Sequence, residues 1–144
     1  MHSGHFLEAL ADKLIADGLG TMPDFNTPPN DGVYVSRMPE ECDNGILLYN
    51  RLPASRIDFT IKDYLRTRFM VVCRGTDRLA TVQKAHAVSE SLQLKCQPET
   101  INGVVFHELY SEASPEEYPV STGDYLEIGL TVRAAYLGDG TYTP

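Results

Sequence analysis

The sequence predicts an α+β fold of two layers, in which two helices pack on one face of a mixed, mostly antiparallel sheet. Residues 65–74 alternate between the two faces of a strand, and residues 79–92 then place apolar side chains every three or four positions, as a helix does. A second helical pattern lies near the start of the chain. The clearest alternation of all, at 124–136, follows near its end.

The first half of the chain supplies one helix and two or three strands. Residues 6–16 gather their apolar side chains on one side and their charges on the other, which predicts an amphipathic helix. The segment 21–31 contains three prolines and predicts an extended connector. Short strands are expected at 32–37 and 45–49, and residues 57–61 form either an edge strand or an extended segment.

The strand at 65–74 passes into the helix at 79–92 through Gly75, Thr76 and Asp77. Glycine permits a sharp change of direction, and Thr76 or Asp77 can cap the helix by accepting hydrogen bonds from its first N–H groups. The turn lacks the glycine spacing and the lysine of a phosphate-binding loop, and Asp77 would repel an anion. We therefore expect a structural corner.

After the second helix the sequence becomes polar, and Pro98 with the pair Asn102-Gly103 predicts a loop. Residues 104–110 then alternate, as a strand does. One expected face carries Val104, Phe106 and Tyr110, and the other carries Val105, His107 and Leu109.

The last third of the chain is expected to hold a long loop, a strand and a tail. Residues 111–123 are rich in Ser, Glu and Pro, and a loop of this length is often functional. The strand at 124–136 has one apolar face, and its other face is either wet or in an interface. The two ends, about 1–4 and 138–144, are expected to be flexible.

Composition favours one folded domain that spans 1–144, with 42% hydrophobic and 22% charged residues. The net charge is −8, from 12 basic and 20 acidic residues, which argues against tight non-specific binding to nucleic acid. The longest apolar run, at 69–73, is far shorter than the ~20 residues that span a bilayer. We therefore expect no membrane partner, and a protein that is cytosolic where it is made.

Three cysteines at wide spacing, Cys42, Cys73 and Cys96, do not suggest a disulfide framework. They are expected to be free thiols. Cys73 lies within the apolar strand, which favours a buried structural role over a reactive one.

No arrangement of residues indicates catalysis. His2 and His5 have the spacing of two ligands on one helical turn, but no third ligand can be assigned to them. His86 lies beside an apolar stripe, and the adjacent pair His107-Glu108 points to opposite sides of a strand. We therefore predict no enzyme, no catalytic residue, no cofactor and no metal site.

Arg66, Arg68 and Arg74 share one strand parity, so they emerge on one face of the sheet, and Arg133 joins them if its strand pairs nearby. They are either solvated charges or contacts to an acidic surface of another subunit. The long loop either docks on a neighbour or stays free at the surface. The candidate interface consists of Arg66, Arg68, Arg74, Arg133, Glu112, Glu116, Glu117 and Tyr118.

Three passages carry a resemblance to a known family: HFLEALADKLIADGLG at 5–20, RTRFMVVCRGTDRLATVQKAHAVSESL at 66–92, and EYPVSTGDYLEIGLTVRAAY at 117–136. In layout the chain resembles the tail terminator and minor tail or capsid proteins of long-tailed bacteriophages. The resemblance covers roughly half of the chain. Neither the proline-rich segment 21–30 nor the loop 111–120 is matched by it.

The resemblance implies a small α+β subunit that assembles in the host cytoplasm into a hexameric ring. Such a ring caps the tail tube, fixes its length, and joins it to the head connector or stopper protein at the head-proximal end of the virion tail. No active-site residues follow from it. Genomic DNA would pass through the ring without specific binding, and an acidic lumen would let it slide.

Two alternatives remain open from the sequence. One is a head-to-tail connector or minor capsid protein of the same particle. The other is a small-molecule binding or enzymatic domain with a site over the open sheet face, using His86 or His107. The quaternary state distinguishes a ring protein from the last of these.

Overall fold

The computed structural model describes residues 6–22, 32–38, 44–50, 56–57, 64–94, 98–112, 116–118 and 126–137. Within these ranges the chain forms two helices and an eight-stranded sheet. In chain order the elements are α1 (Phe6–Ala16), β1 (Gly32–Val35), β2 (Gly45–Asn50), β3 (Arg56–Ile57), β4 (Tyr64–Gly75), α2 (Arg78–Ser91), β5 (Glu99–Ile101), β6 (Val104–Ser111), β7 (Glu116–Tyr118) and β8 (Leu126–Leu137).

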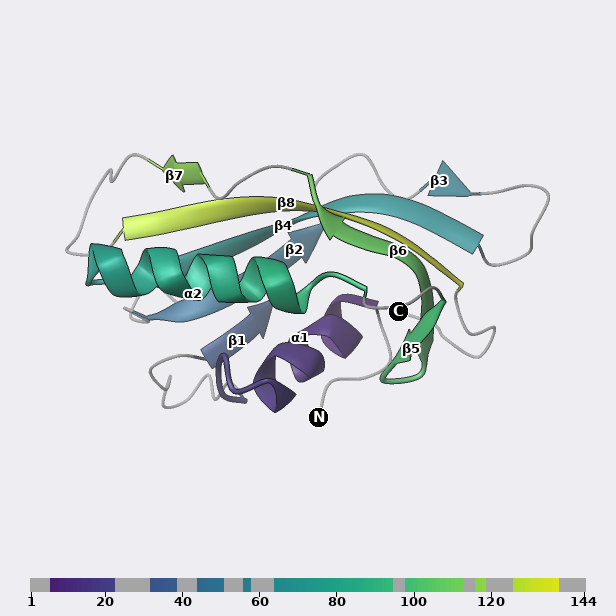
Figure 1. Ribbon diagram of the computed structural model, residues 1–144, viewed down its shortest axis with the longest axis horizontal. Coiled ribbons are helices and arrows are strands. Elements are labelled where there is room, and N and C mark those ends of the chain that lie inside the picture. Colours follow the sequence, from purple (N-terminus) through teal and green to yellow (C-terminus); the bar gives the residue numbers. More distant parts are fainter. Residues whose placement is uncertain are drawn as a thin grey trace.

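The sheet runs in the order β1-β2-β4-β8-β6-β5, with β3 added beside β4 and β7 added beside β8. β1 and β2 are parallel, and the other pairs are antiparallel. Both helices lie on the same face of this sheet (Figure 1). The predicted α+β class, with a mixed and mostly antiparallel sheet, is confirmed.

The centre of the sheet is the antiparallel pair β4 and β8. The two strands pair without a break from Tyr64↔Leu137 to Gly75↔Leu126. Each outer edge of the pair is shared by two shorter segments: β2 and β3 line β4, while β6 and β7 line β8. The sequence predicted residues 111–123 as a loop, which was wrong in part because β7 continues the edge of β8 where β6 ends.

The main core lies between this pair and the helices. Phe69, Val71 and Cys73 of β4 are fully buried, and their partners across the strands are Val132, Leu130 and Ile128. Alternation places these apolar side chains on the helix side, as the sequence predicted.

α1 is anchored at its first residue. The ring of Phe6 stacks on Tyr136 at 4.5 Å between centroids and meets Phe69 edge-on at 5.7 Å. The helix ends at Ala16 because Gly18 adopts φ +80° and the N–H of Leu19 donates to the carbonyl of Leu14. This is the Schellman arrangement, in which glycine accepts the left-handed conformation at no steric cost. The predicted bounds of this helix, 6–16, are confirmed.

α2 begins as predicted, with the side chain of Asp77 accepting a hydrogen bond from the N–H of Leu79. Its buried stripe differs from the prediction because Leu79 is 65% exposed. The stripe starts at Thr81, whose hydroxyl donates to the carbonyl of Asp77 at 2.7 Å. Thr81 can be the first residue of the buried face, although it is polar, because the carbonyl of the capping residue Asp77 accepts its hydrogen bond. The stripe consists of Thr81, Ala85, Val88 and the following Leu92.

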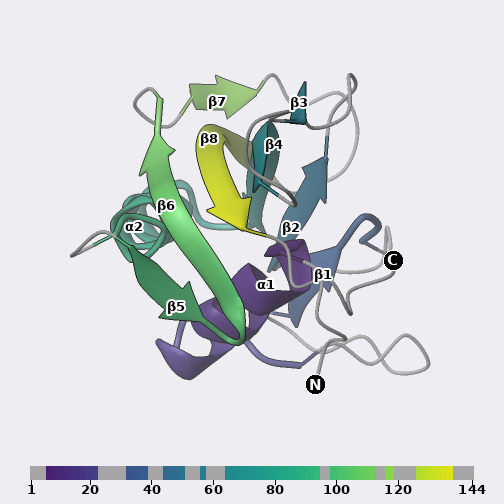
Figure 2. The same cartoon turned by 90° about the vertical axis from the view of Figure 1, so that its right-hand side faces the viewer.

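The segment before β6 was predicted as a loop, and this was wrong for Glu99–Ile101, which form β5. β5 and β6 form a hairpin whose turn residues Asn102 and Gly103 both have positive φ, 48° and 86°. Asn-Gly favours this two-residue turn because both residues tolerate the left-handed region. The amide of Asn102 donates to the carbonyl of Ala9 at 2.8 Å, so the hairpin curls towards α1 (Figures 1 and 2).

The two faces of β6 also differ from the prediction. The register against β8 shifts between Phe106 and Glu108, which inserts His107 as an extra residue. Beyond this bulge the side-chain parity reverses, so Leu109 is buried and Tyr110 is 39% exposed.

Several predictions concern residues outside the described ranges. They include both chain ends, Cys42, Cys96, and most of the segment 57–61, of which β3 places Ile57 beside β4.

Gly75 is predicted to tolerate no side chain. A Cβ there would collide with Oγ1 of Thr81, which is 3% exposed and held by its bond to Asp77. Gly75→Ala should lower the free energy of unfolding by about 1–3 kcal/mol in chemical denaturation. In a Thr81→Ala background the same change should cost less, since the hydroxyl is gone. Additive costs would contradict the collision.

Cys73 is predicted to make stability fall at high pH. Burial raises the pKa of its thiol to about 12, against the smaller opposing effect of Lys84. The native state therefore holds the proton more tightly, and stability is lost as pH rises through the unfolded value of 9.0. Between about pH 8 and 10.5 wild type should lose about 1–2 kcal/mol more than Cys73→Ala. If wild type and Cys73→Ala lose equal stability over this pH range, ionisation of Cys73 does not contribute to the loss.

Candidate interaction surface

The face of the sheet without helices is partly apolar. Met70 and Val72 of β4 point to this side and are only 8% and 6% exposed. Tyr34, Met38 and Leu47 form a second, small hydrophobic cluster, and Leu47 is the register partner of Val72. The middle of this side of β4 is therefore buried. The exposed arginines, Arg66 and Arg68, lie at one end of the strand.

A polar row crosses three strands at that end. Arg68 on β4 is the register partner of Arg133 on β8, and Arg133 is the partner of Tyr110 on β6. The side chains of Arg68 and Arg133 are 62% and 45% exposed. Like charges directly opposite each other in a sheet destabilise it, so this pairing requires a compensating group.

Glu112 supplies that group. Its Oε1 lies 2.8 Å from Nε of Arg68 and 3.6 Å from Nε of Arg133. The carboxylate is positioned by the backbone, because the N–H of Glu112 donates to the carbonyl of Thr131 at 2.9 Å. The structure thus brings together three of the predicted interface residues: Arg68, Arg133 and Glu112.

Tyr110 completes the row. A terminal nitrogen of Arg133 lies 3.5 Å from the Tyr110 hydroxyl. This contact, followed by the charges of Glu112 and Glu108, raises the pKa of Arg133 above its ordinary value. Tyr110 was missed as a site residue because the bulge that exposes it leaves no signal in the sequence.

Arg66 lies one row further along the same face and is exposed. Its register partner on β8 is Ala135, which in turn pairs with Glu108 on β6. We refer to Arg66, Arg68 and Arg133 as the arginine cluster. All three guanidinium groups belong to one end of the helix-free face.

Arg74 has the same parity but a different environment. It is 9% exposed, and its Nε and a terminal nitrogen donate to Oε2 of Glu127 at 3.2 and 3.1 Å. Glu127 is its register partner, so the pair is formed across the β4–β8 ladder. Arg74 is ion-paired with Glu127 within the chain, so it does not belong to the candidate surface.

The remaining predicted interface residues, Glu116, Glu117 and Tyr118, form β7. Their backbone pairs with Gly129, Ile128 and Glu127 of β8. β7 therefore lies beside residues 127–129 of β8 and does not pair with Arg133, which is four residues beyond Gly129.

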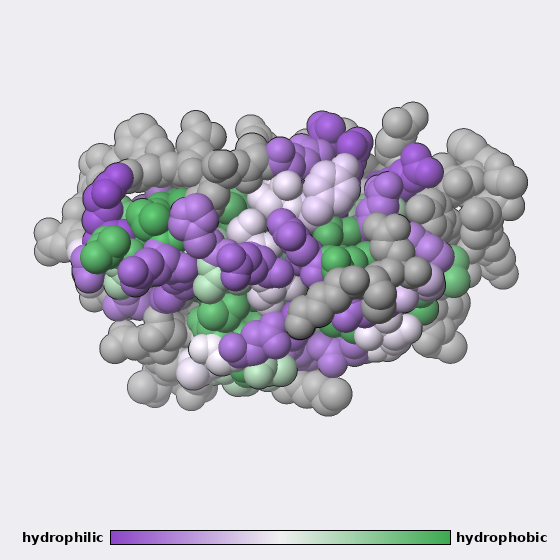
Figure 3. Space-filling model, viewed as in Figure 1, coloured by the Kyte–Doolittle hydropathy of each residue, from purple (hydrophilic) through white to green (hydrophobic). Residues whose placement is uncertain are grey.

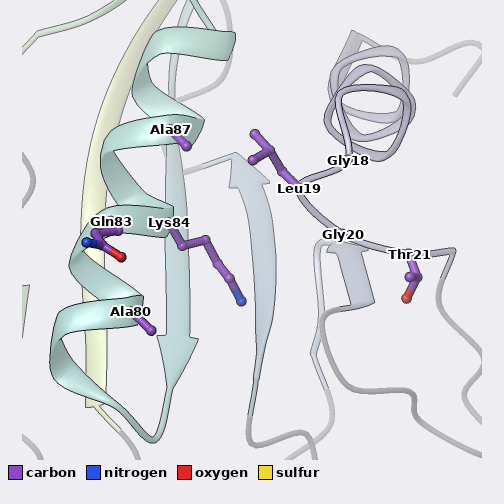
Figure 4. A pocket seen from close by; sticks show the side chains of 8 residues that line it. All are labelled: Gly18, Leu19, Gly20, Thr21, Ala80, Gln83, Lys84 and Ala87. Carbon is purple, nitrogen blue, oxygen red and sulfur yellow. The ribbon is translucent and has the colours of Figure 1, made fainter.

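A shallow groove of about 430 Å³ lies between α2 and the segment 18–21. Lys84 points into it, and Ala80, Gln83 and Ala87 line its helix side (Figure 4). This open groove does not enclose a small molecule. His86 is exposed on α2, and His107 lies at the bulge of β6, so neither belongs to it.

In the described parts of the chain, no three His, Cys, Asp or Glu side chains come together in a way that suits a metal ion. Among the described helices, none is both long and apolar enough to cross a membrane.

The fold recurs in a virion. No family model and no curated protein matches this chain. Among solved structures, a chain in the virion of a native gene transfer agent (GTA) particle superposes with a TM-score of 0.63. The sequences are 18% identical, and the match covers 94% of this chain and 97% of that chain. At this identity the likeness shows a shared fold, which extends over nearly the whole length of both chains.

The different environments of Arg68 and Arg74 predict different effects on stability. Arg74→Glu sets a carboxylate opposite Glu127 in a half-buried position and should lower the free energy of unfolding by about 1–3 kcal/mol. Arg68→Glu, at an exposed position, should change it by less than about 0.5 kcal/mol. Urea denaturation measures both. The exchange Arg74→Glu/Glu127→Arg should recover part of the loss, and no recovery would contradict the assigned pair.

Proposed function

We propose that this chain is a structural protein of a phage-like virion, and specifically a tail terminator. Residues 1–144 would form a single domain that assembles into a hexameric ring. The ring would cap the tail tube and join it to the head connector or stopper protein, with DNA passing through it without specific binding. We assign it no enzymatic activity and no cofactor.

The observation that carries the proposal is the whole-chain likeness to a chain of a gene transfer agent virion, with 94% and 97% of the two chains covered. A match confined to a few elements would fit many small α+β domains. Here the match covers nearly the whole of both chains. This whole-chain likeness supports a role as a virion subunit.

Two features of the chain suit a ring subunit. The sheet exposes charged side chains of Arg68 and Arg133 on a face without helices, which gives a neighbouring subunit a surface to contact. The net charge of −8 suits a channel through which DNA slides, because an acidic wall repels phosphates.

The test is the state of assembly of the purified protein. Size-exclusion chromatography with light scattering should give six copies of the 16.0 kDa chain, roughly 96 kDa, and negative-stain electron microscopy should show rings. With the cognate tail tube protein, the rings should bind tube ends. A stable monomer or dimer that leaves tube ends bare would reject the proposal, and rings that bind only the head connector would assign a connector role instead.

A further inference from the structure

We infer that the arginine cluster binds acidic side chains on the helix side of an adjacent copy of this chain, so that subunits associate head to tail. This inference rests on the proposed function, since it presumes that the chain forms a ring. It specifies which two surfaces of adjacent subunits are in contact and which charged side chains form the contact. It follows from the placement of the charges on the two faces of one sheet.

The arginine cluster is organised to receive an anion. Glu112 holds Nε of Arg68 and lies near Nε of Arg133, which fixes both guanidinium groups side by side. The terminal nitrogens of Arg68 make no further bond among the described residues, and this side chain is 62% exposed. The donors of a single guanidinium group match the two oxygens of a carboxylate.

The charge balance favours a protein carboxylate. Among the described residues, Arg68 and Arg133 share the one carboxylate of Glu112, while the whole chain carries −8. Because the net charge of the chain is negative, another copy of it is on balance an acidic partner for these guanidinium groups. Tyr110, 39% exposed beside Arg133, adds an aromatic contact of the kind enriched in interfaces.

The acidic counterpart lies on the helix side. Glu8 and Asp12 are one turn apart on α1, and Glu90 lies on α2 next to Ser91, on helices that also carry Lys13, Arg78 and Lys84. The two helices meet there, because Nζ of Lys13 is 3.3 Å from Oγ of Ser91. Figure 3 shows hydrophilic residues along the outer sides of both helices.

The two charged surfaces lie on opposite faces of the same sheet, and this limits the symmetry of association. A two-fold dimer through the arginine cluster would set arginine against arginine. Contact between the cluster of one copy and the helices of the next is heterologous, and each copy then uses both surfaces. Such contacts close into a ring or extend into a filament.

Charge reversal with mixing tests the inference. Arg68→Glu/Arg133→Glu should keep the wild-type secondary structure by circular dichroism, with lower stability from the opposed glutamates, and should need at least about tenfold more protein to assemble in light scattering. Arg68→Lys/Arg133→Lys, which keeps the charge, should assemble at near the wild-type concentration. Glu8→Lys/Asp12→Lys, which makes both surfaces basic, should also fail to assemble alone.

An equimolar mixture of the two reversed variants should recover rings, because every contact then joins an acidic surface to a basic one. Subunits must alternate, so native mass spectrometry should find even-numbered rings with equal amounts of each variant. Recovery would establish the head-to-tail contact, and its absence would overturn the assigned acidic partner.

Arg37→Glu, compared with Arg68→Glu, is the matched control, since each reverses one exposed arginine and Arg37 lies outside both the arginine cluster and the helices. If this control loses assembly to the same extent, net charge alone is responsible and the inference is wrong. If wild type forms rings and Arg68→Glu/Arg133→Glu forms them equally well, the inference fails while the proposed function stands. If wild type forms no rings, the proposed function itself fails.

A bound nucleic acid is the competing occupant. Fluorescence anisotropy with a labelled DNA duplex should show no difference between wild type and Arg68→Glu/Arg133→Glu. Binding that only wild type shows, with assembly unchanged in the variant, would assign the cluster to phosphate and overturn the inference.

Discussion

The pairing of β4 with β8 is the constraint on which the rest of the structure depends. It aligns twelve residues of each strand without a bulge, although the two strands lie about sixty residues apart in the chain. Every other strand of the central sheet attaches directly or indirectly to one of these two, and both helices cover the same side of the pair. Because the side-chain period of a strand is two, this single register decides what faces the helices and what faces away.

The same register sets the chemistry of the helix-free face. It places Arg74 opposite Glu127, where the two charges satisfy each other in a half-buried site, and it places Arg68 opposite Arg133, where they do not. The second pair is tolerated because both side chains reach water and Glu112 bridges them. A pair of like charges held together at an exposed position is unfavourable within one subunit. In the head-to-tail contact that we infer, an acidic surface of the next subunit would offset this repulsion.

Several elements could be predicted because their signals are local. The helix at 6–16 has its apolar stripe and its terminating glycine within one stretch, and Asp77 caps α2 through an N–H two residues away. The misses had causes outside the local pattern. β7 is a strand because β8 offers it an edge, Leu79 is exposed because the helix docks through Thr81, and Tyr110 is exposed because a bulge at His107 reverses the parity of β6. The hairpin turn at Asn102-Gly103 was present in the sequence, but the three residues of β5 before it were too few to show alternation.

The sequence by itself determined the class of the fold, the two helices, the central strands, and the fact that Arg66, Arg68 and Arg74 share one face. Parity and periodicity suffice for these, since they depend on residues a few positions apart. Only the tertiary structure decided that Arg68 is exposed while Arg74 is buried. Arg68 and Arg74 have the same parity in the same strand, and they differ in the residue that β8 places opposite each of them. That residue is fixed by a register between distant segments, which no local pattern in either strand specifies.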